Sequence, residues 1–270
     1  MGSQDNQPDW NRIAEKFDIW VPHIAPVGEA LLEALETKPG NNLLDVACGT
    51  GEPALSLARR MGAHVHITCT DAAEGMVNAA RSKAKREGFH DIDFRCMPAE
   101  QLAFPDRSFD RVLCRFGVML FADPLQGLKE MRRVLKPGGR FALAVWSTPE
   151  TMTTLKWAYH VFKNRLPEEN HPPIAKITSL GGDGVLETHL RQAGFGEFTI
   201  EERCFDYAFG SFQEYWDTVE ASDIMKQQFD ALPPGQRETV RDEVAQLARD
   251  FHTPHGLVIP HRYLLAWGSP

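Results

Sequence analysis

Short apolar segments alternate with amphipathic segments over residues 42–146 of this 270-residue chain. The apolar segments have the length of buried strands, and the segments between them repeat apolar side chains every three or four residues, as helices do. The predicted strands span 43–46, 65–70, 92–96, 109–114 and 140–146, and the predicted helices span 53–61, 75–87, 100–102 and 124–134. This alternation predicts βαβ units, a mainly parallel sheet and right-handed crossovers with helices on both faces.

Helical patterns dominate the two ends of the chain. Before the first strand, helices are predicted at 10–20, ending at Pro22, and at 26–35, and we expect them on the sheet edge or over a ligand site as a lid. After residue 146, the predicted helices span 151–166, 184–193 and 211–252, the last broken at 232–235, and the predicted strands span 198–209 and 258–267. No internal repeat or low-complexity segment interrupts this pattern.

The composition predicts a soluble, cytoplasmic protein. The formal net charge is −8 with no block of Lys and Arg, so a nucleic-acid partner is not expected. No apolar run approaches the roughly 20 residues that span a bilayer, and the polar start at 1–9 lacks the pattern of a signal peptide. The five cysteines include no CxxC pair, so we expect buried thiols in a reducing compartment rather than a disulfide framework or a metal site.

The most informative stretch is a glycine turn that follows the first predicted strand. Its sequence is Leu43-Leu44-Asp45-Val46-Ala47-Cys48-Gly49-Thr50-Gly51-Glu52. The glycines let the backbone bend sharply and approach a ligand closely, and the helix that follows offers free N–H groups at its N-terminus. A small molecule binds over such a turn, beyond the carboxyl ends of the strands of an open α/β sheet.

A dinucleotide is the first ligand to consider, because residues 49–54 match G-x-G-x-x-A and Asp71 lies twenty residues beyond Gly51, where an acid suits a ribose diol. Two features oppose it. Asp45 ends the first strand, and its carboxylate would repel a pyrophosphate but attract an ammonium or a sulfonium. Pro53 removes one N–H group from the start of the helix. The pattern favours a ribose with a cationic amino-acid tail and leaves an NAD(P)-dependent oxidoreductase as the weaker alternative.

Four segments together resemble the class I S-adenosylmethionine-dependent methyltransferases, and in particular the small-molecule "methyltransferase type 11" group of ubiquinone/menaquinone methyltransferase-like enzymes. They follow the family order within residues 40–150 and are Leu43-Leu44-Asp45-Val46-Ala47-Cys48-Gly49-Thr50-Gly51, Cys69-Thr70-Asp71-Ala72-Ala73-Glu74-Gly75-Met76, Pro98-Ala99-Glu100-Gln101-Leu102-Ala103-Phe104-Pro105-Asp106-Arg107-Ser108-Phe109-Asp110 and Met131-Arg132-Arg133-Val134-Leu135-Lys136-Pro137-Gly138-Gly139-Arg140. The chain departs from the family pattern at Ala47, where glycine is common, and at Pro98, where many relatives carry an Asp that accepts from the adenine.

The resemblance implies a Rossmann-like, doubly wound α/β fold with a mainly parallel seven-stranded sheet, an antiparallel last strand and a helical cap or lid. On this basis we divide the chain into six parts. They are an N-terminal helical lid (1–40), a cofactor-binding α/β core (41–150), a helical insertion (151–184), a core helix and strand (185–210), a helical cap (211–256) and the last strand (257–270).

The resemblance also implies S-adenosylmethionine as the cofactor. Asp45 is expected to orient the methionine ammonium, directly or through water, and Asp71 is expected to accept both ribose hydroxyls. The backbone from Ala47 to Gly51 should contact the methionine portion, and Ala99 should donate its N–H to the adenine. The expected cofactor-binding set is Asp45, Ala47, Cys48, Gly49, Gly51, Asp71, Ala72, Met76, Ala99, Glu100, Arg115 and Phe116.

Methyl transfer from a sulfonium needs alignment, desolvation and, for oxygen nucleophiles, a base. Aromatic walls suit a cationic donor, and the candidate pocket residues are Phe17, Trp20, Trp146, Trp157 and Trp216. The candidate bases are His160 and His23. The sequence thus predicts a methyltransferase acting on O, C or N of a small metabolite or natural product, as a monomer or homodimer. The alternative is a methyltransferase-fold cyclase or isomerase, or a protein that only binds S-adenosylmethionine.

Overall fold

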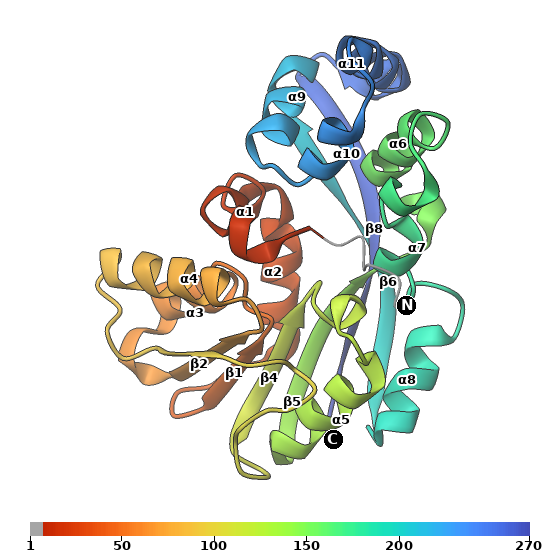
Figure 1. Cartoon of the computed structure of the whole chain (residues 1–270). Coiled ribbons are helices and arrows are strands. Elements are labelled where there is room, and N and C mark those ends of the chain that lie inside the picture. Colours follow the sequence, from red (N-terminus) through yellow and green to blue (C-terminus); the bar gives the residue numbers. More distant parts are fainter. Residues whose placement is uncertain (1–7) are drawn as a thin grey trace.

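The computed structural model describes residues 8–270 of the chain. Most of the polar start that argues against a signal peptide therefore lies outside the described residues. The described chain forms one open, twisted sheet with helices packed against it, and a further group of helices gathers beyond one end of the sheet (Figure 1).

Seven strands follow one another across the sheet in the order β3-β2-β1-β4-β5-β8-β6. Their bounds are β1 Asn42–Val46, β2 His66–Asp71, β3 Asp93–Cys96, β4 Phe109–Arg115, β5 Leu135–Trp146, β6 Phe198–Phe209 and β8 Gly256–Gly268. The pairs among β1 to β5 are parallel, whereas β8 is antiparallel to both β5 and β6. The predicted mainly parallel sheet with an antiparallel last strand is confirmed. An eighth strand, β7 His252–Thr253, pairs with β8 and is too short to leave a sequence pattern.

Apart from the two N-terminal helices, the helices around the sheet begin and end within about one residue of the predicted positions. α2 (Val21–Leu35) packs on β4 and β5, α4 (Glu74–Arg86) packs on β2 and β3, and α5 (Pro124–Val134) packs against α8 (Val185–Ala193). α1 (Trp10–Phe17) lies on α4, and α3 (Ala54–Met61) follows the glycine turn. Short 3₁₀ turns occur at Gly62–His64, Val118–Leu120, Pro149–Thr151, Glu168–Asn170 and Arg249–Phe251.

Five helices form the group beyond the sheet. They are α6 (Thr153–Phe162), α7 (Ile174–Ile177), α9 (Phe212–Ala221), α10 (Lys226–Ala231) and α11 (Gln236–Leu247). β6 and β8 pair over residues 198–209 and 257–268, but β5 pairs with β8 only over residues 263–268. The outer halves of β6 and β8 therefore continue past β5 as a two-stranded ribbon. This ribbon carries α9, α10 and α11 above the carboxyl ends of the parallel strands (Figure 1).

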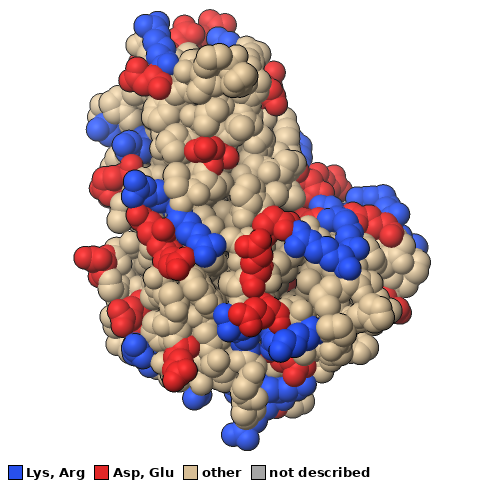
Figure 2. All heavy atoms as spheres, turned by 180° about the vertical axis from the view of Figure 1, so that it is seen from behind, with Lys and Arg blue, Asp and Glu red and all other residues tan. Residues whose placement is uncertain are grey.

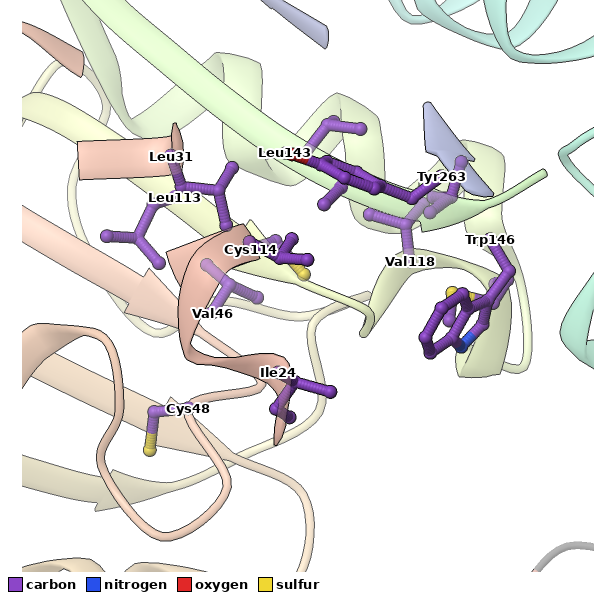
Figure 3. Packing of buried hydrophobic residues seen from close by; sticks show 14 of the residues in the cluster. Ile24, Leu31, Val46, Cys48, Leu113, Cys114, Val118, Leu143, Trp146 and Tyr263 are labelled. Atoms are coloured by element: carbon purple, nitrogen blue, oxygen red, sulfur yellow. The ribbon is translucent and has the colours of Figure 1, made fainter. Parts of the chain in front are cut away.

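A hydrophobic cluster fixes α2 on the sheet beside the first strand. Ile24 and Leu31 of α2 lie over Val46 of β1 and over Leu113 and Cys114 of β4 (Figure 3). Leu31, Leu113 and Cys114 have no exposed surface. Fully burying an aliphatic side chain stabilises the fold by roughly 1.5–3 kcal/mol, so these contacts hold α2 firmly against the end of β1, where the glycine turn begins.

The predicted break between the two N-terminal helices is wrong. α1 ends at Phe17 and α2 begins at Val21, so both Pro22 and Pro26 lie within α2. Pro22 occupies the first helical turn, where the N–H groups have no intrahelical partner anyway. Pro26 removes one intrahelical hydrogen bond, but the packing of α2 on the sheet outweighs that local signal.

Two other predicted boundaries also differ from the structure. Residues 100–102 form a turn rather than a helix, and Gln101 donates its N–H to the carbonyl of Pro98 at 3.2 Å. β5 begins at Leu135, five residues earlier than predicted, because the Pro-Gly-Gly segment that reads as a turn forms an irregular stretch of strand opposite β4. Gly138 has φ of 73° in this stretch, a conformation that glycine adopts readily.

Candidate active site

A cavity of about 620 Å³ lies between the carboxyl ends of β1, β2, β4 and β5 and the helices beyond the sheet. This is the position in which open α/β sheets bind ligands, and the volume is typical of small-molecule sites. Its charged lining residues come from the sheet, its loops, α1 and the cavity rim, whereas α6, α9, α10 and α11 contribute apolar, aromatic and uncharged polar side chains. The cavity therefore has a charged half and an uncharged half.

The glycine turn after β1 bends through left-handed backbone conformations. The φ angle is 56° at Ala47, 54° at Gly49 and 99° at Gly51. A Cβ atom on Gly51 would lie 2.9 Å from Cδ1 of Leu55, so glycine allows α3 to start directly against the turn. Ala47 and Gly49 line the cavity, whereas Gly51 lies behind them. A left-handed conformation is unfavourable for alanine by about 1–2 kcal/mol, so the departure from the family pattern at Ala47 leaves strain in this turn.

Asp45 lies beneath the turn as a buried carboxylate without a partner. Its exposed fraction is 1%, and neither Oδ1 nor Oδ2 accepts a hydrogen bond from the described residues. Burial raises the pKa of Asp45 well above its usual range, and the positive charge of Arg115 offsets this in part. An orphaned buried carboxylate is satisfied by a cationic hydrogen-bond donor, so this site fits the ammonium group of S-adenosylmethionine.

Asp71 ends β2 and holds two backbone segments together. Its Oδ2 accepts from the N–H of Gly49 at 2.9 Å, and its Oδ1 accepts from the N–H of Ala73 at 2.9 Å. Burial raises the pKa of Asp71, and these backbone hydrogen bonds oppose the rise. Ala73, not Asp71, is the N-cap residue of α4. Asp71 lines the cavity, and each carboxylate oxygen keeps a further lone pair that a ribose hydroxyl can use.

The loop after β3 forms the wall next to Asp71. Ala72, Met76, Pro98, Ala99 and Glu100 line the cavity here. Oε1 of Glu100 accepts from the N–H of Asp123 at 3.1 Å, which ties this loop to the start of α5. Pro98 has no side-chain acceptor, so recognition of a base at this wall rests on the loop backbone and on the carboxylate of Glu100.

The opposite wall combines an aromatic stack with an unpaired cation. Phe116 stacks on Trp146 with ring centroids 4.0 Å apart and 7° between the ring planes. Arg115 lines the cavity beside this stack and makes no ion pair or side-chain hydrogen bond within the described part of the chain. Burial lowers the pKa of Arg115, and the negative charge of Asp45 opposes this. A partly buried guanidinium without a partner marks a position for an anionic or hydrogen-bond-accepting group.

α1 covers the glycine turn and links it to the helices beyond the sheet. Thr50 donates from Oγ1 to the carboxylate of Asp18, just after α1, at 2.5 Å. Lys16 pairs with Asp223, in the segment between α9 and α10, at 2.6 Å. Phe17 lies close to Gly49 and lines the cavity. The N-terminal helix thus closes one side of the charged half.

The predicted aromatic residues reach the cavity with one exception. The residues that line it are Phe17, Trp20, Trp146 and Trp216. Trp157 is 4% exposed but packs edge-on against Tyr215 and Phe251 behind the cavity wall. Trp157 does not line the cavity, because its side of α6 faces other aromatic side chains of the cap.

The structure brings neither candidate base to the cavity. α6 turns Leu155 and Ala158 inward, which leaves His160 exposed on the other side of the helix. His23 lies in the first turn of α2 and packs on Phe209 with ring centroids 4.2 Å apart. Burial lowers the pKa of His23, and the charge of Glu214 opposes this. No histidine among residues 8–270 lines the cavity.

His261 lies behind the cavity wall and supports α6. Its Nδ1 donates to the carbonyl of Ile259 at 3.0 Å, and its Nε2 accepts from the N–H of Thr154 at 3.3 Å and lies 2.9 Å from Oγ1 of Thr154. The N–H donor of Thr154 makes Nε2 the acceptor and so fixes the neutral tautomer. Burial lowers the pKa of His261 to about 4. This histidine satisfies the first turn of α6 and is a poor general base.

Several polar residues on the cavity wall were missed in the sequence, and three of them lie toward the helices beyond the sheet. They are Tyr207 of β6, Tyr215 of α9 and Gln228 of α10. The alternating pattern of residues 198–209 places Tyr207 on the buried side of its strand, a signal that could have been used. Gln228 lies in a six-residue helix, where no pattern distinguishes an inward glutamine from an outward one.

The structure offers little support for a reactive thiol, a metal site or a membrane span in the described residues. Hydrogen bonding with Cys69, together with burial, raises the pKa of Cys48, so its thiol stays protonated. Within residues 8–270, no three His, Cys, Asp or Glu side chains are grouped so that they could hold a metal ion. Across the same residues, no helix combines the length and hydropathy needed to cross a membrane.

Comparison with known proteins gives a family match over the core. The ubiE/COQ5 methyltransferase family matches residues 28–171, more than half of the chain. A demethylmenaquinone methyltransferase from Listeria welshimeri is 38% identical over 118 residues, or 44% of this chain and 50% of the relative. A ubiquinone/menaquinone biosynthesis C-methyltransferase from Geotalea daltonii is 38% identical over 132 residues, or 48% of this chain and 56% of the relative. The chain spans about half the length of the curated relatives it matches.

Solved structures share the fold over most of the chain. The YcgJ protein from Bacillus subtilis superposes with a TM-score of 0.61 at 20% identity, covering 90% of this chain and 97% of that protein. A SAM-dependent methyltransferase from Aquifex aeolicus superposes with a TM-score of 0.54 at 22% identity, covering 72% of this chain and 93% of that protein. These likenesses confirm the Rossmann-like α/β fold.

Proposed function

The chain belongs to the ubiE/COQ5 methyltransferase family, and on that premise we propose that it transfers a methyl group from S-adenosylmethionine to a carbon or oxygen atom of a small quinone-type ring. S-adenosylmethionine is the cofactor of this family. The curated relatives are named for demethylmenaquinone and for ubiquinone/menaquinone biosynthesis. The observation that carries the proposal is Asp45, a buried carboxylate without a partner at the base of a cavity whose other half is apolar and aromatic.

The donor is held in the charged half. Asp45 accepts from the methionine ammonium, directly or through water, and Asp71 accepts from the ribose hydroxyls while it keeps its bonds to the glycine turn. The adenine lies between Met76 and the loop of Ala99 and Glu100, and the backbone of residues 47–51 follows the methionine tail. The cofactor-binding residues expected from the sequence line this one cavity, except Asp45 and Gly51, which lie just beneath its surface.

The chain contributes alignment and desolvation to the reaction. When bound, S-adenosylmethionine supplies an activated methyl group on a sulfonium. The stack of Phe116 on Trp146 provides an aromatic surface for that positive charge, and α1 keeps water away from the donor side. Arg115, whose charge interacts with that of Asp45, offers a partner to the carboxylate of the methionine tail.

Several wider expectations belong to the same proposal. On the face shown in Figure 2, basic and acidic side chains are interspersed with no continuous basic patch, which supports a small molecule rather than a nucleic acid as the partner. A cytoplasmic location, a monomeric or homodimeric state and the six-part division of the chain complete it. No observation favours the cyclase, the binding-only protein or the oxidoreductase.

The test is a transfer assay with the whole chain. The reduced form of 1,4-naphthoquinone and S-adenosylmethionine are incubated with the protein, and S-adenosylhomocysteine and a product heavier by one CH₂ group are measured by mass spectrometry. Asp71→Asn should abolish both products, whereas Asp206→Asn, on an exposed position of β6, should leave them unchanged. A folded protein that binds S-adenosylhomocysteine but forms neither product with any ring hydroquinone refutes the proposal.

A further inference from the structure

The uncharged half of the cavity is enclosed by the helices beyond the sheet, and we call it the cap chamber. Its walls come from α6, α9, α10 and α11 and include Phe162, Trp216, Val219, Phe229, Val240 and Val244. Asp223 at the rim is the charged lining residue of this region, and it is paired with Lys16 of α1. A charged ligand group would lose its hydration here without gaining a partner, so the chamber selects an uncharged molecule.

Gln228 is the polar exception in this apolar chamber. Its exposed fraction is 3%, and it lines the cavity from α10. Its carboxamide makes no hydrogen bond within the described part of the chain, and the carboxamide atoms keep some accessible surface. The carboxamide therefore faces the cavity with donors and an acceptor unused. Buried amides without partners are rare in folded proteins, which indicates that a ligand supplies the partner.

Tyr215 adds a second unpartnered group to the same chamber. It lies on α9, is 5% exposed and lines the cavity, and its hydroxyl makes no hydrogen bond with the described residues. Burial raises the pKa of Tyr215, so the hydroxyl stays protonated and available as a donor. Trp216 and Phe229 lie beside these two groups with ring centroids 5.6 Å apart and offer faces for a flat ring.

We propose that the cap chamber is a subsite for an uncharged aromatic or quinone ring, and that Gln228 and Tyr215 hydrogen-bond to an oxygen atom on that ring. The aromatic walls provide affinity and the two polar groups fix which edge of the ring faces the donor. That this ring is the methyl acceptor rests on the proposed function. Both residues lie outside the matched region 28–171, so the family match assigns them no role.

The experiment measures binding of three ring probes by titration calorimetry with S-adenosylhomocysteine at saturation. The probes are 2-naphthol, naphthalene and 2-naphthalenesulfonate, which share a ring and differ in carrying a hydroxyl, no polar group or a negative charge. The wild type should bind 2-naphthol, and it should bind the sulfonate at least tenfold more weakly because the chamber offers it no cation. Val244→Trp, which fills the chamber, should remove 2-naphthol binding.

The decisive variant is Gln228→Leu, which keeps the size of the side chain and removes its polar group. It should weaken 2-naphthol binding by roughly 5- to 50-fold, as expected for a ring hydroxyl left without its partner, and change naphthalene binding by less than about twofold. Tyr215→Phe should act in the same direction. Gln246→Leu, an exposed position of α11, is the matched control and should change neither affinity.

The outcomes separate this proposal from the proposed function. Equal weakening of both neutral probes by Gln228→Leu, or no weakening of either, overturns the subsite, and so does a wild type that binds neither neutral ring. A wild type that binds 2-naphthol through Gln228 but transfers no methyl group supports the subsite and overturns the proposed function. Unchanged S-adenosylhomocysteine affinity in Gln228→Leu shows that the variant is folded.

Discussion

Replacing Asp45 with asparagine tests whether the buried carboxylate holds the cationic tail of the donor. Asp45→Asn keeps the shape of the side chain and removes its charge. Because the carboxylate is 1% exposed and unpartnered, burial raises its pKa well above the usual range in the free protein. An ammonium placed against it favours the charged form and lowers that pKa again. Ligand binding should therefore release protons from Asp45 in the pH range between its pKa values in the bound and the free protein.

The size of the effect follows from the type of bond that is lost. Hydrogen bonds to charged groups contribute roughly 1.5–3 kcal/mol net, which corresponds to a weakening of S-adenosylhomocysteine binding by about 10- to 150-fold. The free variant should lose no stability. A carboxyl whose pKa is raised in the folded state stabilises it fully below the unfolded value near 4 and loses that contribution as pH rises toward the folded value. Asp45→Asn has no carboxyl to titrate and so does not lose stability in this way. Its free energy of unfolding, compared with that of the wild type, should therefore increase with pH.

Titration calorimetry in buffers of different ionisation enthalpy counts the protons released between pH 5.5 and 8. The wild type should release protons on binding S-adenosylhomocysteine, and Asp45→Asn should not. The control ligand is 5′-methylthioadenosine, which lacks the amino-acid tail and should bind both proteins alike. If the variant binds S-adenosylhomocysteine as tightly as the wild type, or loses both ligands equally, the assignment of Asp45 to the ammonium is refuted.

Three further predictions concern the framework of the site. Because the pKa of His261 is lowered to about 4, the protein should lose about 3 kcal/mol of stability as pH falls from 6.5 to 4. Urea denaturation should show a weaker pH dependence for His261→Phe, which should also be about 2–4 kcal/mol less stable than the wild type at pH 7. If the stability of the variant depends on pH as steeply as that of the wild type, this role of His261 is contradicted. Gly117→Ala should lower stability by about 1–3 kcal/mol, since its Cβ would lie 2.6 Å from Cβ of Ala47. Ala47→Gly should raise thermal stability by up to about 1 kcal/mol and recover part of the Gly117→Ala loss in the double variant; strictly additive effects would show that the two do not meet.

The donor half of the site could be predicted because its binding residues occur in short contiguous motifs. Asp45 and Asp71 each end a parallel strand, and the carboxyl ends of such strands meet at one edge of a sheet. The strand order was therefore not needed to bring them to one place. Ala47 was recognised as a departure from the family pattern, and the structure adds its physical consequence, a left-handed alanine.

Whether the predicted histidines reach the cavity depends on how helices turn against the sheet. Residues 151–166 read as one helix in the sequence, but only its rotational setting decides that Leu155 faces the cavity and that His160 faces outward. That setting is fixed by contacts with β8 and α11, which lie about a hundred residues away along the chain. The same limit applies to Pro22 and Pro26, whose local signal was outweighed by the packing of α2 on β4 and β5.

The two halves of the cavity differ in the kind of polar group that they leave without a partner. Asp45 and Arg115 are ionisable, and each depends on a ligand group for full satisfaction, which matches the charged tail of the donor. Gln228 and Tyr215 are uncharged, which matches a neutral ring. Since the charged pair is carried by β1 and β4 and the neutral pair by α9 and α10, substitutions in the cap can change the acceptor without disturbing the donor. Asp45, Asp71 and Arg115 lie within the matched region 28–171, whereas both cap residues lie outside it.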